Sequence, residues 1–181
     1  DTVNGGDGND SILGGEFAAA IDQADAATLL TLRILASEVA GNAPNVFCGP
    51  GLTLATAEVD GGTVVLNSAI GTALTANEGT VLLRGSGAVA QLNVLGGKVI
   101  YNTSGTLGGN TILAGEGILD FSQDMSTKTI TNPIEMQSEE CRVEDPNKVT
   151  SGLVLDFNYA DVEINGMRPG RNRRLTVGVP A

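Results

Sequence analysis

A short repeat in the middle of the chain constrains the fold more than any other feature of the sequence. Four glycines, Gly62, Gly79, Gly97 and Gly117, follow one another at spacings of 17, 18 and 20 residues. The residues five and three positions before each glycine, and two and four positions after it, are apolar in every unit: Ala57, Val59, Val64 and Leu66; Leu74, Ala76, Val81 and Leu83; Leu92, Val94, Val99 and Tyr101; Ile112, Ala114, Leu119 and Phe121. Such alternation predicts a short strand on each side of a glycine-containing bend.

A unit of about 18 residues cannot cover its own apolar stripe, and stacking of successive units covers it. The predicted fold is therefore all-β, a β-solenoid (β-helix) with rungs of about 18 residues joined by backbone hydrogen bonds. Aromatic residues make up only 3% of the chain, which suits a narrow aliphatic core. The positions five after each glycine, Asn67, Arg84, Asn102 and Ser122, predict a partial ladder of stacked polar side chains. A small β-sandwich built from similar hairpins is the alternative.

The pattern divides the chain into four segments: residues 1–16, rich in Gly and Asp; residues 17–50; the β-solenoid over residues 51–165; and a basic C-terminal tail over residues 166–181. Within the solenoid the repeat becomes irregular after residue 122, as expected of outer rungs that must blunt an open edge. Further strands are expected around Ile130, Ile134 and Met136, around Val143 and Val149 with a loop at 145–147, at Leu153, Leu155 and Phe157, and at Val162 and Ile164.

The segment 17–50 has a mixed pattern. Alanine and leucine favour a short helix over residues 17–26. Residues 28–36 fit a helix or a strand, because Leu30, Leu32 and Ile34 alternate with Thr31 and Arg33. The stretch from Gly41 to Gly51 contains two prolines and predicts a loop.

Composition excludes several classes of function. The chain has 21 acidic against 10 basic residues, a formal charge of −11, no His and two Cys. Binding to nucleic acid through a general basic surface is not expected, because phosphate contacts need clustered Lys and Arg. The lack of His excludes imidazole catalysis and His-ligated zinc, and two Cys cannot form a four-Cys zinc site. No apolar stretch approaches the roughly 18–20 residues that a membrane helix needs.

The charges are unevenly distributed along the chain. All 21 acidic residues precede position 168, whereas Arg168, Arg171, Arg173 and Arg174 contribute four of the ten basic residues within seven positions. Because guanidinium groups pair well with carboxylates, this tail predicts docking on an acidic partner, such as a neighbouring subunit. Folding back onto the acidic body of the same chain is the alternative. Alternation at Leu175, Val177 and Val179 also predicts a strand that is added to a neighbour.

The first 16 residues resemble a known repeat. The run from Gly5 to Leu13, GGDGNDSIL, is similar to the calcium-binding nonapeptide of RTX proteins, with remnants of further repeats on either side. In that family glycine-rich turns offer carbonyl oxygens and an Asp completes the site, as suits a hard cation. The resemblance implies calcium ligands at Gly6, Asp7, Gly8 and Asp10. Tight turns without metal are the alternative.

A second resemblance covers about Val59 to Asp156. The segments LNVLGGKVIYN (92–102), GILDFSQD (117–124) and KTITN (128–132) give a cadence similar to β-helical proteins of the virion surface of tailed bacteriophages. This resemblance implies a β-solenoid that decorates or projects from a particle, often as a trimer. Gly-, Thr- and Asn-rich solenoids of autotransporter passengers and adhesins have similar sequences.

Several carboxylates of the repeat region are candidates for chemistry at the solenoid surface. Glycan-cleaving solenoids use projecting carboxylates, for which the candidates here are Asp60, Glu78, Glu116, Asp120 and Asp124. Their positions relative to the repeat glycines differ, so they are expected to be solvated acids rather than one catalytic stack. Cys48 and Cys141 either form a disulfide closing a loop of over 90 residues or remain two buried thiols.

The sequence therefore predicts a non-enzymatic structural protein of a phage virion, most simply a capsid decoration or cement protein. Five or six rungs would make a stub about 25–30 Å long with two unprotected ends, so a homotrimer or burial of one end on the shell is expected. The expected partners are copies of the chain and the major capsid protein or another virion protein, with neither nucleic acid nor membrane, no required cofactor and Ca²⁺ as an optional one. The alternatives are an extracellular RTX-type calcium-dependent surface protein or adhesin and a glycan-cleaving enzyme of the tailspike type.

Overall fold

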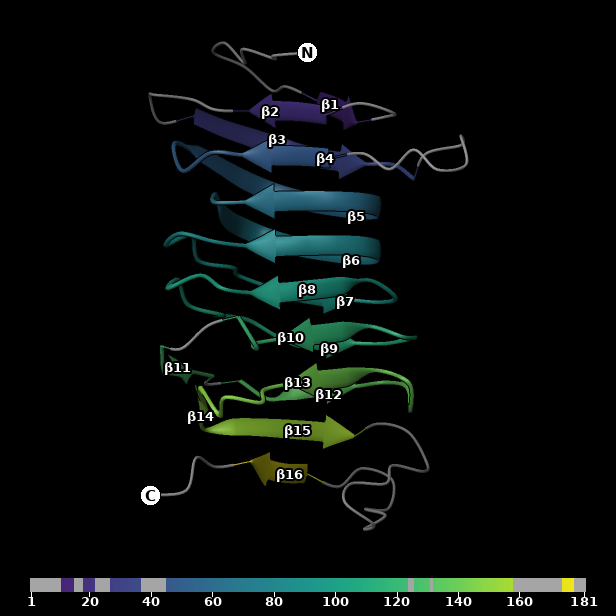
Figure 1. Ribbon diagram of the computed structural model, residues 1–181, viewed down its shortest axis with the longest axis vertical. Helices are drawn as coiled ribbons and strands as arrows, with labels where there is room; N and C mark the ends of the chain where they lie inside the picture. Colours follow the sequence, from purple (N-terminus) through teal and green to yellow (C-terminus); the bar gives the residue numbers. More distant parts are fainter. Residues whose placement is uncertain are drawn as a thin grey trace.

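The computed structural model describes residues 11–14, 18–21, 27–36, 45–123, 126–130, 132–157 and 174–177. Every regular element in these ranges is a β-strand, and strands of successive rungs stack in parallel into a β-solenoid of about six turns (Figure 1). The predicted fold class is therefore confirmed, and the β-sandwich alternative is excluded. No helix within these ranges is long and apolar enough to cross a membrane.

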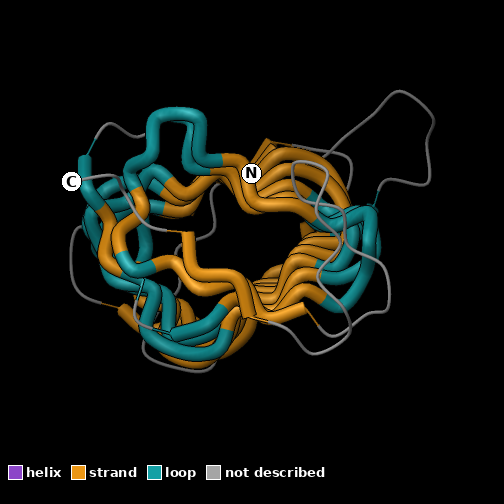
Figure 2. The backbone as a smooth tube through the Cα atoms, turned by 90° about the horizontal axis from the view of Figure 1, so that it is seen from below, coloured by secondary structure: helices purple, strands orange, loops and turns teal. Residues whose placement is uncertain are grey.

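Two stacks of strands form the two long faces of the solenoid. The first face consists, in order, of β1 (Ser11–Gly14), β3 (Ala27–Ile34), β5 (Leu52–Leu66), β6 (Ala69–Leu83), β7 (Leu92–Val94), β9 (Thr111–Leu113), β12 (Ile134–Met136) and β15 (Leu153–Phe157). The second face consists of β2 (Ala18–Ile21), β4 (Asn45–Cys48), the later halves of β5 and β6, β8 (Lys98–Tyr101), β10 (Ile118–Asp120) and β13 (Arg142–Glu144). Seen along the stack, successive rungs superimpose around a closed, elongated outline (Figure 2).

A narrower third side completes each rung. The parallel bridges from Ile70 to Val89 and from Val89 to Leu107 lie there, and β11 (Lys128–Thr129) pairs with β14 (Thr150–Ser151) as a separate two-stranded sheet. At the C-terminal end, β16 (Arg174–Val177) runs antiparallel to β15, the one antiparallel pair among the described strands. The strand expected in the tail is thus formed by residues 174–177, and it pairs with the last rung of its own chain.

The core is built from columns of inward-facing residues. On the second face, one column runs through Val46, Val64, Val81, Val99 and Leu119, each paired in register with the next. These five side chains are at most 4% exposed, and buried columns of the same kind line the inside of the first face. Because neighbouring rungs lie about 4.8 Å apart, each side chain covers the one below it.

The predicted slots stack as expected through three units, but half of the fourth unit is shifted. Leu92 and Val94 pair with Thr111 and Leu113, and not with Ile112 and Ala114 as predicted. Ile112 therefore lies on the outer surface. The fourth unit contains a longer bend before Gly117, which includes Gly115 at a φ of +55° and so moves its first strand one residue earlier in the chain. The later slots, Leu119 and Phe121, are placed as predicted.

Aromatic residues enlarge the core toward the C-terminal end. Tyr101 and Phe121 are both buried, and their ring centroids lie 5.5 Å apart at a tilt of 49°. The hydroxyl of Tyr101 donates a hydrogen bond of 2.8 Å to the carbonyl oxygen of Gly105, so its polar end is satisfied inside the protein.

The expected ladder of stacked polar side chains does not form among the described residues, and only backbone hydrogen bonds link these positions. The N–H groups of Asn67, Arg84 and Asn102 donate to the carbonyl oxygens that end the strands one rung earlier. Within the described residues, however, no hydrogen bond joins the side chains of Asn67, Arg84, Asn102 and Ser122 to one another, and the side-chain oxygen of Asn67 is buried without a partner. Stacked side-chain hydrogen bonds occur elsewhere, as from Asn93 to Thr75.

The N-terminal part departs most from the sequence prediction. The helix expected over 17–26 is wrong where it can be judged, because residues 18–21 form β2 in parallel with β4. Residues 28–36, which fitted either state, contribute to strand β3. The loop expected over 41–51 contains strand β4 at 45–48. The stack thus already includes residues 11–14, upstream of the predicted solenoid boundary at 51.

The C-terminal rungs follow the irregular pattern that was expected. Strands β12, β13 and β15 continue the two long faces, and a turn over 145–147 separates β13 from β14. The carboxylate of Asp145 accepts hydrogen bonds from the backbone of Val149 and from the backbone and hydroxyl of Thr150. The strand expected at Val162 and Ile164 lies outside the described residues.

The bend glycines provide a stability test with a matched control in the same strand. Gly79 has a φ of +76°, and a Cβ added there would lie 2.5 Å from the carbonyl oxygen of Gly62. Gly79→Ala should lower the free energy of unfolding by at least about 2 kcal/mol, measured by chemical denaturation. Gly71→Ala, whose Cβ would meet its nearest neighbour at 3.8 Å, should be neutral or slightly stabilising. Equal stabilities of the two variants would contradict this stacking of the bends.

Candidate functional site

The strongest cluster of charge lies on the outer surface of the second face, across strands β8, β10 and β13. The register places Lys98 and Arg142 on either side of Ile118, and Asp120 directly beside Glu144. Lys98 Nζ lies 2.6 Å from Asp120 Oδ2 and 3.3 Å from Glu144 Oε2. Arg142 Nε lies 2.9 Å from Glu144 Oε1. Four side chains from three rungs thus form one alternating network, which we call the β8–β13 charge network.

Asp120 is the buried member of the charge network. Its side chain is only 4% exposed, whereas that of Lys98 is 33% exposed. Burial alone would raise the pKa of Asp120, but hydrogen bonds from Lys98 and from the Ser122 side chain and backbone, together with the lysine charge, outweigh it and hold that pKa below its ordinary value. The hydrogen bond to Asp120 is the main reason that the pKa of Lys98 is raised above its ordinary value. Both groups are therefore charged near neutrality.

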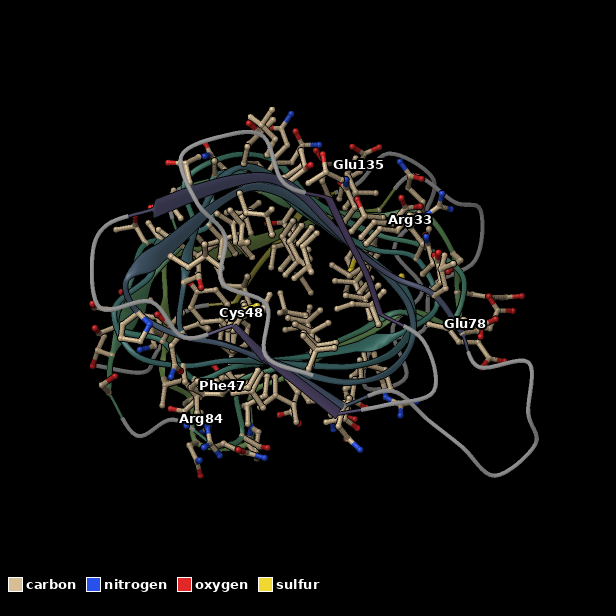
Figure 3. The ribbon with its side chains drawn as sticks, turned by 90° about the horizontal axis from the view of Figure 1, so that it is seen from above. Arg33, Phe47, Cys48, Glu78, Arg84 and Glu135 are labelled. Atoms are coloured by element: carbon tan, nitrogen blue, oxygen red, sulfur yellow. The ribbon has the colours of Figure 1, made fainter. Side chains whose placement is uncertain are left out.

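A second cluster lies on the outside of the first face. Arg33 Nε lies 3.3 Å from Glu58 Oε2, and its Nη2 lies 3.5 Å from Asp60 Oδ2. The Asn77 amide donates to Asp60 Oδ1 at 2.6 Å and to Glu58 Oε1 at 3.3 Å. Arg33 projects outward from the ribbon (Figure 3) and is about half exposed, so the cluster contributes little stability and mainly relieves repulsion between stacked acids.

The five carboxylates singled out in the sequence do not come together. Asp60 and Glu78 are register neighbours on β5 and β6, and Glu116 lies exposed in a bend. Asp120 belongs to the charge network, and Asp124 lies outside the described residues. A general acid for glycan cleavage needs a raised pKa, whereas that of Asp120 is held low. The geometry thus favours ion pairing over proton donation at this residue.

Sequence reasoning missed three members of the charge network. It selected Asp120 but not Lys98, Arg142 or Glu144. A signal existed, because Lys98 and Asp120 lie one and three positions after repeat glycines and so fall on the outward-facing side of the alternation. The pairing with Glu144, 46 positions from Lys98, could not be read from spacing, because the intervening rungs are irregular in length.

The two cysteines are separate, buried free thiols. Cys48 ends β4, and its burial raises the pKa of the thiol to about 12. Cys141 directly precedes β13, with β5, β6, β8 and β10 stacked between the two levels. At about 4.8 Å per rung, this separation far exceeds the reach of a disulfide. The disulfide alternative is therefore wrong, and the thiols pack as small apolar groups.

The remaining predicted sites lie mostly outside the described residues. This applies to the calcium ligands expected at Gly6, Asp7, Gly8 and Asp10, and to Arg168, Arg171 and Arg173 of the tail. Arg174 begins β16, where its backbone lies opposite Asp156 of β15. Over the ranges that the structure describes, no three His, Cys, Asp or Glu side chains gather as potential metal ligands.

Comparison with known proteins identifies no relative of this chain. No family model, no curated protein and no solved structure matches it. The fold and the surface chemistry described above are therefore the basis for the functional proposal.

The charge network predicts a pH-dependent contribution to stability. A carboxylate whose pKa is lowered on folding stabilises the native state above its unfolded pKa, and this contribution is lost as the pH falls through the folded pKa. A lysine whose pKa is raised contributes fully below its ordinary pKa and loses this contribution as the pH rises through the raised value. The Asp120–Lys98 pair should therefore stabilise the fold most between about pH 5 and pH 9.

Asp120→Asn should lower the free energy of unfolding by about 1–2 kcal/mol at neutral pH, and the difference from wild type should shrink at acidic pH. Denaturation followed by circular dichroism at several pH values measures both effects. Glu116→Gln, which changes an exposed acid in a bend, should alter stability by less than about 0.5 kcal/mol. A pH-independent deficit in Asp120→Asn would contradict the ion-pair assignment.

Proposed function

We propose that this chain is a non-enzymatic structural protein of a tailed-phage virion, a decoration or cement protein that binds the capsid shell as a homotrimer. The observation that carries the proposal is the uninterrupted stack of buried side chains that runs along the solenoid from β3 to β15. One such column is Ile34–Val59–Ala76–Val94–Leu113–Met136–Phe157, in which each buried side chain packs on the next while backbone hydrogen bonds join the rungs. A stiff rod of this kind is suited to load-bearing or display at a particle surface.

The charge distribution supports the same role. The buried carboxylate of the charge network, Asp120, is bound by Lys98, and Asp60 is bound by Arg33 and Asn77. These acids serve cohesion between rungs, and a chain of net charge −11 remains soluble when many copies are crowded on a shell. Nucleic acid is not a partner in this proposal, because the same charge repels phosphate.

The partner surface in this proposal is acidic, and the tail is the element that docks on it. Arg168, Arg171, Arg173 and Arg174 follow all 21 acidic residues in the sequence. Residues 174–177 of this tail form strand β16, which lies beside β15 at the C-terminal rung. A shell protein, most simply the major capsid protein, would then meet the solenoid at this end, and the opposite end would project outward.

Binding to shells tests the proposal directly. Particles assembled without this chain should bind the purified protein in a saturable manner, and electron microscopy should place it at threefold or quasi-threefold positions. A variant with Arg168, Arg171, Arg173 and Arg174 changed to Ser should bind at least about 10-fold more weakly and with less salt dependence. A variant with Arg33 and Arg84, two exposed arginines outside the tail and the charge network, changed to Ser provides a control for charge on the body. Absence of binding to shells by the wild-type protein would overturn the proposal.

Calcium separates this proposal from the RTX-type alternative. In a decoration protein, EDTA and millimolar Ca²⁺ should give melting temperatures within about 2 °C of each other, since the solenoid core carries the stability. A large rise in the melting temperature with Ca²⁺, abolished by Asp7→Ala and Asp10→Ala, would instead indicate a calcium site in residues 1–16. That result would favour the calcium-dependent surface protein. Differential scanning calorimetry measures the shift.

A further inference from the structure

The second face carries a column of apolar side chains on its outer surface. Phe47, Val65, Leu82 and Ile100 come from β4, β5, β6 and β8, and each is paired in register with the next. All four are partly exposed, whereas their inward-facing strand neighbours are buried. Phe47 lies outside the ribbon and Cys48 inside it (Figure 3). We call these four residues the outer apolar column.

The first face shows what an ordinary solvent-exposed side of this solenoid looks like. Its corresponding outward column consists of Arg33, Glu58, Thr75, Asn93, Ile112, Glu135 and Asp156, each in register with the next. Only one of these seven residues is apolar. A sheet with one solvated face alternates apolar inward and polar outward residues, whereas parallel strands that are apolar on both sides are covered on both sides. The outer apolar column therefore marks a covered face.

The charges of the second face bear on which partner suits it. Among its described strand residues the charged side chains are Lys98, Asp120, Arg142 and Glu144, two of each sign. The chain as a whole carries −11, so two copies repel each other across most of their surfaces. The second face is a neutral surface on which identical acidic chains can approach.

The charges are also ordered across the face. Lys98 and Arg142 occupy the same column as Thr63 and Thr80, at the start of each strand. Asp120 and Glu144 continue the outer apolar column, two positions later in the strand. One lateral side of the face is thus cationic toward its C-terminal end and the other is anionic. Because Lys98 and Arg142 already pair with Asp120 and Glu144 within the chain, this end of the column carries no net charge where copies meet.

We propose that the second face binds a second copy of this chain, with the solenoid axes parallel, and that the outer apolar columns meet around the symmetry axis of the homotrimer. The parallel arrangement matches the copies level by level, so Phe47 faces Phe47 and the charge networks lie at one height. This proposal deepens the structural role proposed above by naming the surface between copies. Its test uses the isolated protein, so its failure is distinguishable from a failure to bind shells.

Matched substitutions on the two faces test the surface. Leu82→Lys places like charges against one another at the axis and should weaken self-association at least about 10-fold. Ile112→Lys makes a comparable change at the outward apolar position of the first face, beside Glu135, and should leave the oligomer intact. Sedimentation velocity at several concentrations measures association, and circular dichroism checks that both variants retain the fold. A wild-type monomer at about 100 µM, or an oligomer that Leu82→Lys leaves unchanged, overturns the proposal.

Cysteine cross-linking tests the parallel orientation. Phe47→Cys and Ile100→Cys, made separately, lie three rungs apart on the outer apolar column. A parallel assembly brings each residue to its own counterpart, so both variants should form disulfide-linked dimers on mild oxidation, whereas the buried Cys48 and Cys141 of the wild type should not. An antiparallel pair cannot match both levels with themselves, so cross-linking of one variant alone, or of neither, overturns the parallel arrangement.

Discussion

The parallel register between rungs is the constraint on which the rest of the structure depends. A strand of three or four residues, such as β7 or β10, has too few contacts to be stable alone, and its backbone groups are satisfied only by the rungs on either side. The same register aligns equivalent side chains, so Val64, Val81 and Val99 form one column. Hydrogen bonding and packing thus reinforce each other at every level, and a change in one rung alters the packing and hydrogen bonding of the adjacent rungs.

The bends show how closely the rungs approach one another. Gly62 and Gly79 share a positive φ at successive levels, and the backbone of one leaves no room for a Cβ on the other. Glycine is therefore needed where two bends stack in contact. Where the bend changes, as before Gly117, the chain shifts its strand register by one residue and continues the column with Thr111 and Leu113. The core tolerates a rung of different length as long as inward-facing residues remain available.

The two faces of the solenoid differ in the side chains that are stacked on their outer surfaces. On the first face, stacked acids such as Glu58 and Asp60 are balanced by Arg33 and Asn77. On the second face, apolar residues occupy four successive levels, and the β8–β13 charge network begins at the fourth of them. Since every outward position is repeated at the next rung, a preference for one residue type becomes a stripe. Stripes of this kind give a solenoid extended surfaces for lateral contact, and the proposed assembly uses the second of them.

The sequence predicted the structure correctly where the signal was local and repeated. It failed where the structure depends on pairing between strands of different rungs. The alternation around Gly62, Gly79 and Gly97 predicted every inward slot of three rungs. The alanines of β2 favoured a helix, but pairing with β4 overrode that weak preference. Asp120 was recognised as a candidate, whereas its partner Lys98 was not, because their contact crosses between rungs.

The sequence by itself determined the fold class, the side of each central strand that faces inward and the positions of the bends, because these follow from a two-residue alternation and a repeat of about 18 residues. Only the tertiary structure decided which rung opposes which, and therefore that Lys98 reaches both Asp120 and Glu144 and that Phe47, Val65, Leu82 and Ile100 align. The physical reason is that contacts between rungs depend on the number of residues in each circuit. That number varies along the chain and is set by how the complete stack satisfies its backbone hydrogen bonds.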